Sequence, residues 1–97
     1  MIKIKLRGKD GKEKTYTQNW VPVRKMLEAF ELTDENYPDL KEFLLKSAEY
    51  IADVMGHGLT TDDILNGVST WEWPTFLDGF YAQLNGGIDP EIQPEKE

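Results

Sequence analysis

The chain has 97 residues, of which 39% are apolar, and it contains no cysteine. That length suits one domain with one small core, and the missing cysteines exclude disulfides, thiol nucleophiles and Cys-ligated metals. The net charge of −7 opposes contact with nucleic acid or an anionic membrane, and no apolar run has the length of a membrane span or a signal-peptide core.

The charge is divided unevenly along the chain. Residues 1–25 hold eight Lys or Arg and two acidic residues, a net charge of +6. Residues 26–97 hold three Lys and sixteen acidic residues, a net charge of −13. One interpretation places the basic segment against acidic helices, either of its own fold or of a neighbouring copy. The other gives it an anionic partner, and we favour the first.

The N-terminal residues predict a β-hairpin. Apolar and basic side chains alternate over residues 2–7, which is the period of a strand with one buried face. Asp10 and Gly11 together are a strong turn signal, and the return strand is expected at residues 15–18.

Two registers of this hairpin are compatible with the sequence. A two-residue turn places Tyr16 opposite Lys5, whereas a loop one residue longer places Tyr16 opposite Leu6 and Trp20 opposite Ile2. We expect the longer loop, because a buried face fixes the register more firmly than a turn preference does.

The middle of the chain predicts two helices. Pro22 suits the first turn of a helix. The apolar residues that follow are spaced so that they form one stripe, which predicts a first helix over about residues 22–32 with that stripe facing the core. Pro38 opens the second helix, which ends at Gly56, expected in the left-handed conformation. The stripe of the first helix is Val23, Met26, Leu27 and Phe30. The inner face of the second is Leu40, Phe43, Leu44, Ser47, Ile51 and Val54.

The C-terminal third predicts a short helix and then a longer one. Thr61 is expected to cap the short helix over residues 62–66, and Gly67 to stop it. Ser69 and Glu72 have the spacing of a capping box for the longer helix. One side of that helix is expected to hold Trp73, Phe76, Leu77, Phe80, Tyr81 and Leu84.

The expected fold class is therefore α+β, an N-terminal β-hairpin packed with a small bundle of three to four helices. Residues 1–87 form the single domain. Residues 88–97 contain two Pro and four acidic residues, a composition that predicts a disordered acidic C-terminal tail.

No group of residues has the spacing of a catalytic or metal site. His57 is the only histidine and lies between two glycines, so we interpret it as a loop residue rather than as a base or ligand. Asp62 and Asp63 are interpreted as favourable charges at a helix N-terminus rather than as a magnesium site. The sequence predicts a non-enzyme with no catalytic residue, no metal and no cofactor.

Aromatic side chains crowd residues 71–81. Most belong in the core by their helical spacing, but a core of this size cannot bury every ring. Exposed aromatic residues concentrate binding energy at protein interfaces, and the acidic setting argues against stacking on nucleic-acid bases. The expected partner-binding residues are Trp20, Trp71, Trp73 and Tyr81.

Two stretches of the sequence carry a family resemblance. The first runs from the alternating residues 2–6 through Tyr16 into residues 20–22 and the helix that follows. The second is residues 61–67, Thr-Asp-Asp-Ile-Leu-Asn-Gly, followed by a helix rich in aromatic and aliphatic residues. With them the chain resembles the tail assembly chaperones of long-tailed phages and prophages of Gram-positive bacteria.

The resemblance implies a non-catalytic protein that binds the tape measure protein, a long and aggregation-prone helical rod, and keeps it soluble during tail assembly. It implies a protein of the host bacterial cytoplasm that is absent from the mature virion. It also implies a longer form, made by ribosomal frameshifting, whose added domain recruits the tail tube protein. This chain would be the short form. A homo-oligomer of this chain is compatible with the sequence. The family has no catalytic motif, so the resemblance assigns no site residues to this chain.

The sequence also allows two other classes of function, an acidic inhibitor and a small enzyme. An acidic phage-encoded inhibitor or nucleic-acid mimic would bind a host protein through carboxylates at regular, phosphate-like spacing on one face. Here the carboxylates are scattered, and the basic N-terminal segment weakens the mimicry. A small enzyme would need a pocket of convergent polar groups that the sequence does not indicate.

Overall fold

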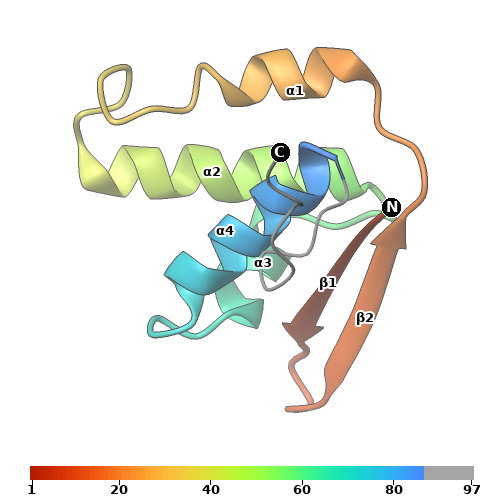
Figure 1. Ribbon diagram of the computed structural model, residues 1–97. Helices are drawn as coiled ribbons and strands as arrows, with labels where there is room; N and C mark the ends of the chain where they lie inside the picture. Colours follow the sequence, from red (N-terminus) through yellow and green to blue (C-terminus); the bar gives the residue numbers. More distant parts are fainter. Residues whose placement is uncertain (87–97) are drawn as a thin grey trace, which may run out of the picture.

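The computed structural model describes residues 1–86, in which a two-stranded hairpin is followed by four helices (Figure 1). This confirms the expected α+β class, while the predicted disordered tail lies outside the described residues. The elements in chain order are β1 (Ile2–Arg7), β2 (Glu13–Gln18), α1 (Val23–Ala29), α2 (Leu40–Met55), α3 (Thr61–Gly67) and α4 (Trp73–Leu84).

The register of the hairpin differs from both registers derived from the sequence. Tyr16 lies opposite Ile4. Beyond the strand ends, the Gly8 amide donates to the Lys12 carbonyl at 2.9 Å, which leaves residues 9–11 as a three-residue loop. The Gly11 amide donates to the Gly8 carbonyl at 3.0 Å, and Gly11 has a φ of 81°. A turn closed by a positive-φ residue is the usual three-residue hairpin loop, and glycine adopts it without strain. The shift of two residues from the expected register keeps Tyr16 on the buried face.

Two helix caps also differ from expectation. The cap of α3 is Thr60, whose hydroxyl accepts from the Asp63 amide at 3.2 Å while the Asp63 carboxylate accepts from the Thr60 amide at 2.9 Å. A capping box needs an acidic or amide side chain three residues after the cap, and that position counted from Thr61 is the apolar Ile64.

The start of α4 has no capping box. Glu72 is its N-cap residue and forms no side-chain cap hydrogen bond. The Glu72 amide instead donates to the Ser69 carbonyl at 3.1 Å, which makes a turn of residues 69–72. The Ser69 hydroxyl is buried without a hydrogen-bond partner among residues 1–86. Gly56, which ends α2, has the expected positive φ of 67°, but its ψ of −139° lies outside the left-handed helical region.

The core lies where β1, the C-terminal half of α2, α3 and α4 meet (Figure 1). The inner face of β1 is almost fully buried, as its alternation predicted. Gly67 at the end of α3 allows close approach to β1, because a Cβ there would lie 2.9 Å from the Cβ of Leu6. The buried apolar residues are Ile2, Ile4, Leu6, Ala48, Tyr50, Ile51, Ala52, Val54, Met55, Ile64, Phe80 and Leu84.

The core leaves α1 and the first half of α2 largely outside it. α1 lies alongside α2, on the side away from α3 and α4 (Figure 1), and contains no buried residue. The buried residues of α2 begin at Ser47. None of the helices described within residues 1–86 combines the length and the hydropathy needed to cross a membrane.

Candidate partner-binding surface

Three of the four residues of the apolar stripe predicted on the first helix face solvent, and the fourth, Met26, is half-buried. Val23 is 71% exposed, Leu27 58% and Phe30 66%. The helix packs inward instead through a second set of apolar residues, of which Ala29 and Leu32 touch the core. The expectation that the Val23 stripe faces the core is therefore wrong, because α1 is apolar on two sides and only one of them meets α2.

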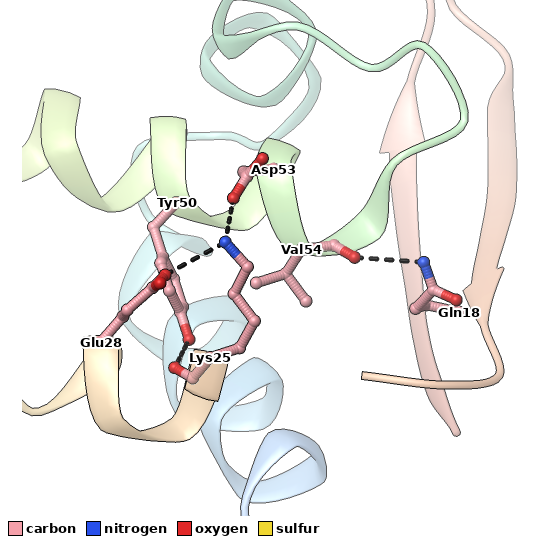
Figure 2. A network of polar contacts seen from close by, with 6 residues as sticks. All are labelled: Gln18, Lys25, Glu28, Tyr50, Asp53 and Val54. Carbon is pink, nitrogen blue, oxygen red and sulfur yellow. Dashed lines mark hydrogen bonds and ion pairs between the residues drawn. The ribbon is translucent and has the colours of Figure 1, made fainter. Parts of the chain in front are cut away.

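Polar contacts fasten α1 to α2, as Figure 2 shows. The Lys25 ammonium pairs with Asp53 of α2 and, at 3.1 Å, with Glu28 one turn further along α1. The Tyr50 hydroxyl of α2 donates to the Lys25 backbone carbonyl. We call Lys25, Glu28, Tyr50 and Asp53 the α1 clasp. It holds the inward face of α1 in place without covering the outward stripe.

The electrostatics of the α1 clasp follow from its contacts. The hydrogen bonds to Asp53 and then to Glu28 raise the pKa of Lys25, so its ammonium is further stabilised. Burial raises the pKa of Tyr50 to about 12, because an ionised phenol would lose its hydration there. Both groups are therefore held in the forms that make the contacts, a charged Lys25 and a neutral Tyr50.

Trp20 lies in the segment between β2 and α1 and is exposed, as the outward stripe of α1 is. Its indole is 75% exposed, and its amide donates at 3.3 Å to the side chain of Gln18. The amide group of Gln18 in turn donates to the carbonyls of Val54, as drawn in Figure 2, and of Met55, at 3.2 and 3.1 Å. The end of β2 is thus anchored to α2 immediately before Trp20.

The four exposed residues Trp20, Val23, Leu27 and Phe30 are together called the α1 stripe. Val23 and Leu27 lie in α1 and Phe30 is its C-cap residue, with spacings of four and three residues, whereas Trp20 precedes the helix, before the extended Pro22. Apolar residues at alternating intervals of three and four form the seam along which two helices pack in a coiled coil. A row with this spacing, exposed on a peripheral helix, is therefore suited to an amphipathic helix of another protein.

The other aromatic residues expected to bind a partner divide into two groups. Trp71 is 82% exposed and lines an open groove of about 450 Å³ between β1 and α4. Trp73 stacks on Phe76 with 5.7 Å between ring centroids, and Tyr81 stacks on Tyr50 at 6.4 Å. Both Trp73 and Tyr81 are half-buried against the core, and burial raises the pKa of Tyr81.

The structure does not bring the four expected aromatic residues together. Trp20 borders a hollow with Met1, Gln18 and Leu84, whereas Trp71 borders the groove beside Lys3 and Lys5. Sequence reasoning missed three members of the α1 stripe because it treated them as core. A signal was present, since residues 21–32 carry apolar side chains on more than one helical face.

The residues considered for chemistry have structural roles in the fold. His57 lies in the loop after α2 with a φ of 60°, and its Nε2 is 2.6 Å from the Thr17 carbonyl oxygen of β2. Asp63 belongs to the α3 capping box. Among residues 1–86 no cluster of three or more His, Asp or Glu side chains has the arrangement of a metal site.

Fold and surface together define a small α+β domain that presents an apolar row on a peripheral helix, an arrangement suited to binding another protein. The phage tail chaperone protein family matches residues 1–97, and the chain belongs to that family. None of the curated proteins and none of the solved structures matches it.

Proposed function

We propose that this tail chaperone binds the tape measure protein during tail assembly and keeps it soluble, using the α1 stripe as its principal contact. The observation that carries the proposal is the exposure of Val23, Leu27 and Phe30 on a helix that buries no residue. A small monomer rarely leaves such a row uncovered unless another molecule covers it.

The chemistry of the stripe matches a helical partner. Large apolar side chains at a protein interface contribute about 1–3 kcal/mol each when they fill the partner's surface. The heptad-like spacing selects a helix, and the tape measure protein is a long helical rod according to the family resemblance. The net charge of −7 favours solubility of a complex that would otherwise expose apolar helices.

The wider role follows the family. The chain would act in the host cytoplasm while the tail is built and leave before the virion is complete, with the tail tube protein recruited indirectly. Its contribution would be binding, with no covalent chemistry. Trp71 is a second candidate contact, because among residues 1–86 it is the most exposed of the large apolar residues and it lies outside the α1 stripe.

Co-expression with the tape measure protein tests this proposal. We expect the double variant Leu27→Ser, Phe30→Ser to lose most of the soluble yield of the tape measure protein, while its own thermal midpoint stays within a few degrees of wild type. Leu40→Ser is the matched control, because Leu40 is 74% exposed but lies outside the stripe.

Each other outcome has a definite meaning. If the double variant solubilises the tape measure protein as well as wild type does, the α1 stripe is not the contact. If Trp71→Ala alone abolishes the yield, the groove beside β1 is the binding face instead. If the wild-type chain does not solubilise the tape measure protein, the chaperone proposal itself fails.

A further inference from the structure

The exposed surface of the hairpin is basic and contributes no residue to the α1 stripe. Its six Lys and Arg side chains are all exposed, and no salt bridge within residues 1–86 involves any of them. Of the basic residues 1–25, Lys25 pairs with acidic residues of α1 and α2, whereas the basic side chains of the hairpin form no such ion pair within residues 1–86. The six residues are Lys3, Lys5, Arg7, Lys9, Lys12 and Lys14.

A surface of opposite character lies between α1 and α2. It is an open groove of about 480 Å³ lined by four carboxylates, two tyrosines, Leu32 and Lys46. Glu28 and Asp53 pair with Lys25, and Glu49 pairs with Lys46 at 3.6 Å, so Glu31 is the one groove carboxylate without an ion pair within residues 1–86. The four carboxylates still outnumber these two lysines and leave the groove acidic. The lining tyrosines are Tyr37, half-buried, and Tyr50, buried. Carboxylates beside aromatic rings suit lysine and arginine side chains.

The two surfaces are far apart in one molecule. Figure 1 shows the loop between β1 and β2 pointing away from α1 and α2. The molecule is elongated, with extents of 46 × 31 × 26 Å. A hairpin cannot reach the groove of its own chain in this fold, but it can reach that of a second copy.

We propose that the hairpin tip of one copy, carrying Lys9 and Lys12, docks in the α1–α2 groove of a second copy beside Glu31 and Glu49. The contact joins unlike surfaces, so it links copies head to tail. Charge complementarity carries this assignment, because residues 3–14 have a net charge of +4 and residues 26–55 a net charge of −6. No residue of the α1 stripe lines this groove, so the stripe stays available to another partner.

A second copy fits the hairpin better than nucleic acid does. A duplex held at the hairpin would face the −7 charge of the whole chain and leave the acidic groove empty. In an assembly of copies, the basic hairpins and the acidic grooves neutralise each other.

The test is sedimentation velocity of the full chain over a range of concentrations at about 0.02 M and about 0.5 M salt, since screening shortens the reach of exposed charges. We expect wild type to associate at low salt and to dissociate at high salt. Lys9→Glu with Lys12→Glu, and separately Glu31→Gln with Glu49→Gln, should each weaken association about tenfold or more. Arg24→Glu with Lys41→Glu is the control of equal charge change, because neither residue lies in the hairpin or lines the groove.

A mixture of the two variants gives the sharpest result. The Lys9→Glu, Lys12→Glu chain keeps a wild-type groove, and the Glu31→Gln, Glu49→Gln chain keeps a wild-type hairpin. Mixed, they should form a one-to-one heterodimer that grows no further.

Four results would overturn the proposal. Wild type could stay monomeric at low salt, or its association could be unchanged by salt and by the variants. The mixture of the two variants could stay monomeric, or the control variant could associate as weakly as the hairpin variant does. Binding of a DNA duplex by wild type, lost with Lys9→Glu and Lys12→Glu, would assign the hairpin to nucleic acid instead.

Discussion

Gly67 and Gly79 differ in how much space a side chain would have beside them. At Gly67 a Cβ would lie 2.9 Å from the Cβ of Leu6 and 3.4 Å from the Arg7 amide nitrogen. A Cβ at Gly79, inside α4, would meet nothing within 4 Å beyond the backbone of its own helix. Neither residue has a positive φ, so the difference between them is steric rather than conformational.

We therefore expect opposite effects from the same substitution. Gly67→Ala should lower the free energy of unfolding by about 1–3 kcal/mol, because strand β1 cannot move aside without disturbing the core. Gly79→Ala should raise it by about 0.5–1 kcal/mol, because alanine restricts the unfolded chain and favours the helix. Urea denaturation measures both, and a destabilising Gly79→Ala or a neutral Gly67→Ala would contradict the packing described here.

Tyr50 gives the fold a dependence on alkaline pH. Its pKa is raised from an ordinary 10.0 to about 12 by burial, so between these values the unfolded chain releases a proton that the folded chain retains. Its contribution to stability is fully present below pH 10 and is lost as the pH rises towards 12. At about 1.4 kcal/mol per pKa unit, the loss is at most about 2–3 kcal/mol.

Tyr50→Phe isolates this effect. At neutral pH the variant should be about 1 kcal/mol less stable than wild type, because the hydroxyl that donates to Lys25 is gone. The difference should shrink or reverse between pH 10 and 12, since phenylalanine does not titrate. Denaturation of both proteins across that range checks the expectation, and a constant difference would refute it.

At the scale of elements, α1 is the weakly held part of the domain. It contains no buried residue, and the α1 clasp and the half-buried Ala29 and Leu32 hold it on α2. By contrast, the C-terminal half of α2 supplies much of the core. Elements with few buried contacts open locally at lower free energy than core elements do.

Hydrogen exchange should report this difference directly. Backbone amides of α1 are expected to exchange faster than those of residues 47–55 in α2. Tyr50→Phe should speed exchange in both helices, because it lowers the stability of the whole domain, and α1 should remain the faster of the two. Equal protection of the two helices would mean that α1 unfolds only with the whole domain.

Local patterns in the sequence were enough to predict the hairpin, the four helices and the buried face of β1. The register was not predictable, because the three-residue loop with Gly11 at positive φ competes with turns of nearly equal preference. The burial of the first helix was also misjudged, since periodicity identifies an apolar face but not which neighbour covers it. At the candidate site, the sequence pointed to Trp20 but not to Val23, Leu27 and Phe30.

At the scale of the whole molecule, the domain boundary expected at residue 87 can be tested by truncation. Within the described residues 1–86, the core runs from Ile2 to Leu84. A chain that ends at Gly87 should therefore unfold within a few degrees of the full-length midpoint. A fall of about 10 °C, equivalent to about 1–2 kcal/mol at this size, would show that residues 88–97 contribute to folding.

The molecule as a whole separates an apolar row on α1 from its basic hairpin, and we propose that this row contacts the tape measure protein. Site-specific photocrosslinking tests it most directly, with a photoreactive amino acid at Leu27 and, as the control, at the exposed Asp62 of α3. Co-expressed with the tape measure protein, the chain labelled at position 27 should form the crosslinked complex, and the chain labelled at position 62 should not. A crosslink at position 62 with none at 27 would contradict the account.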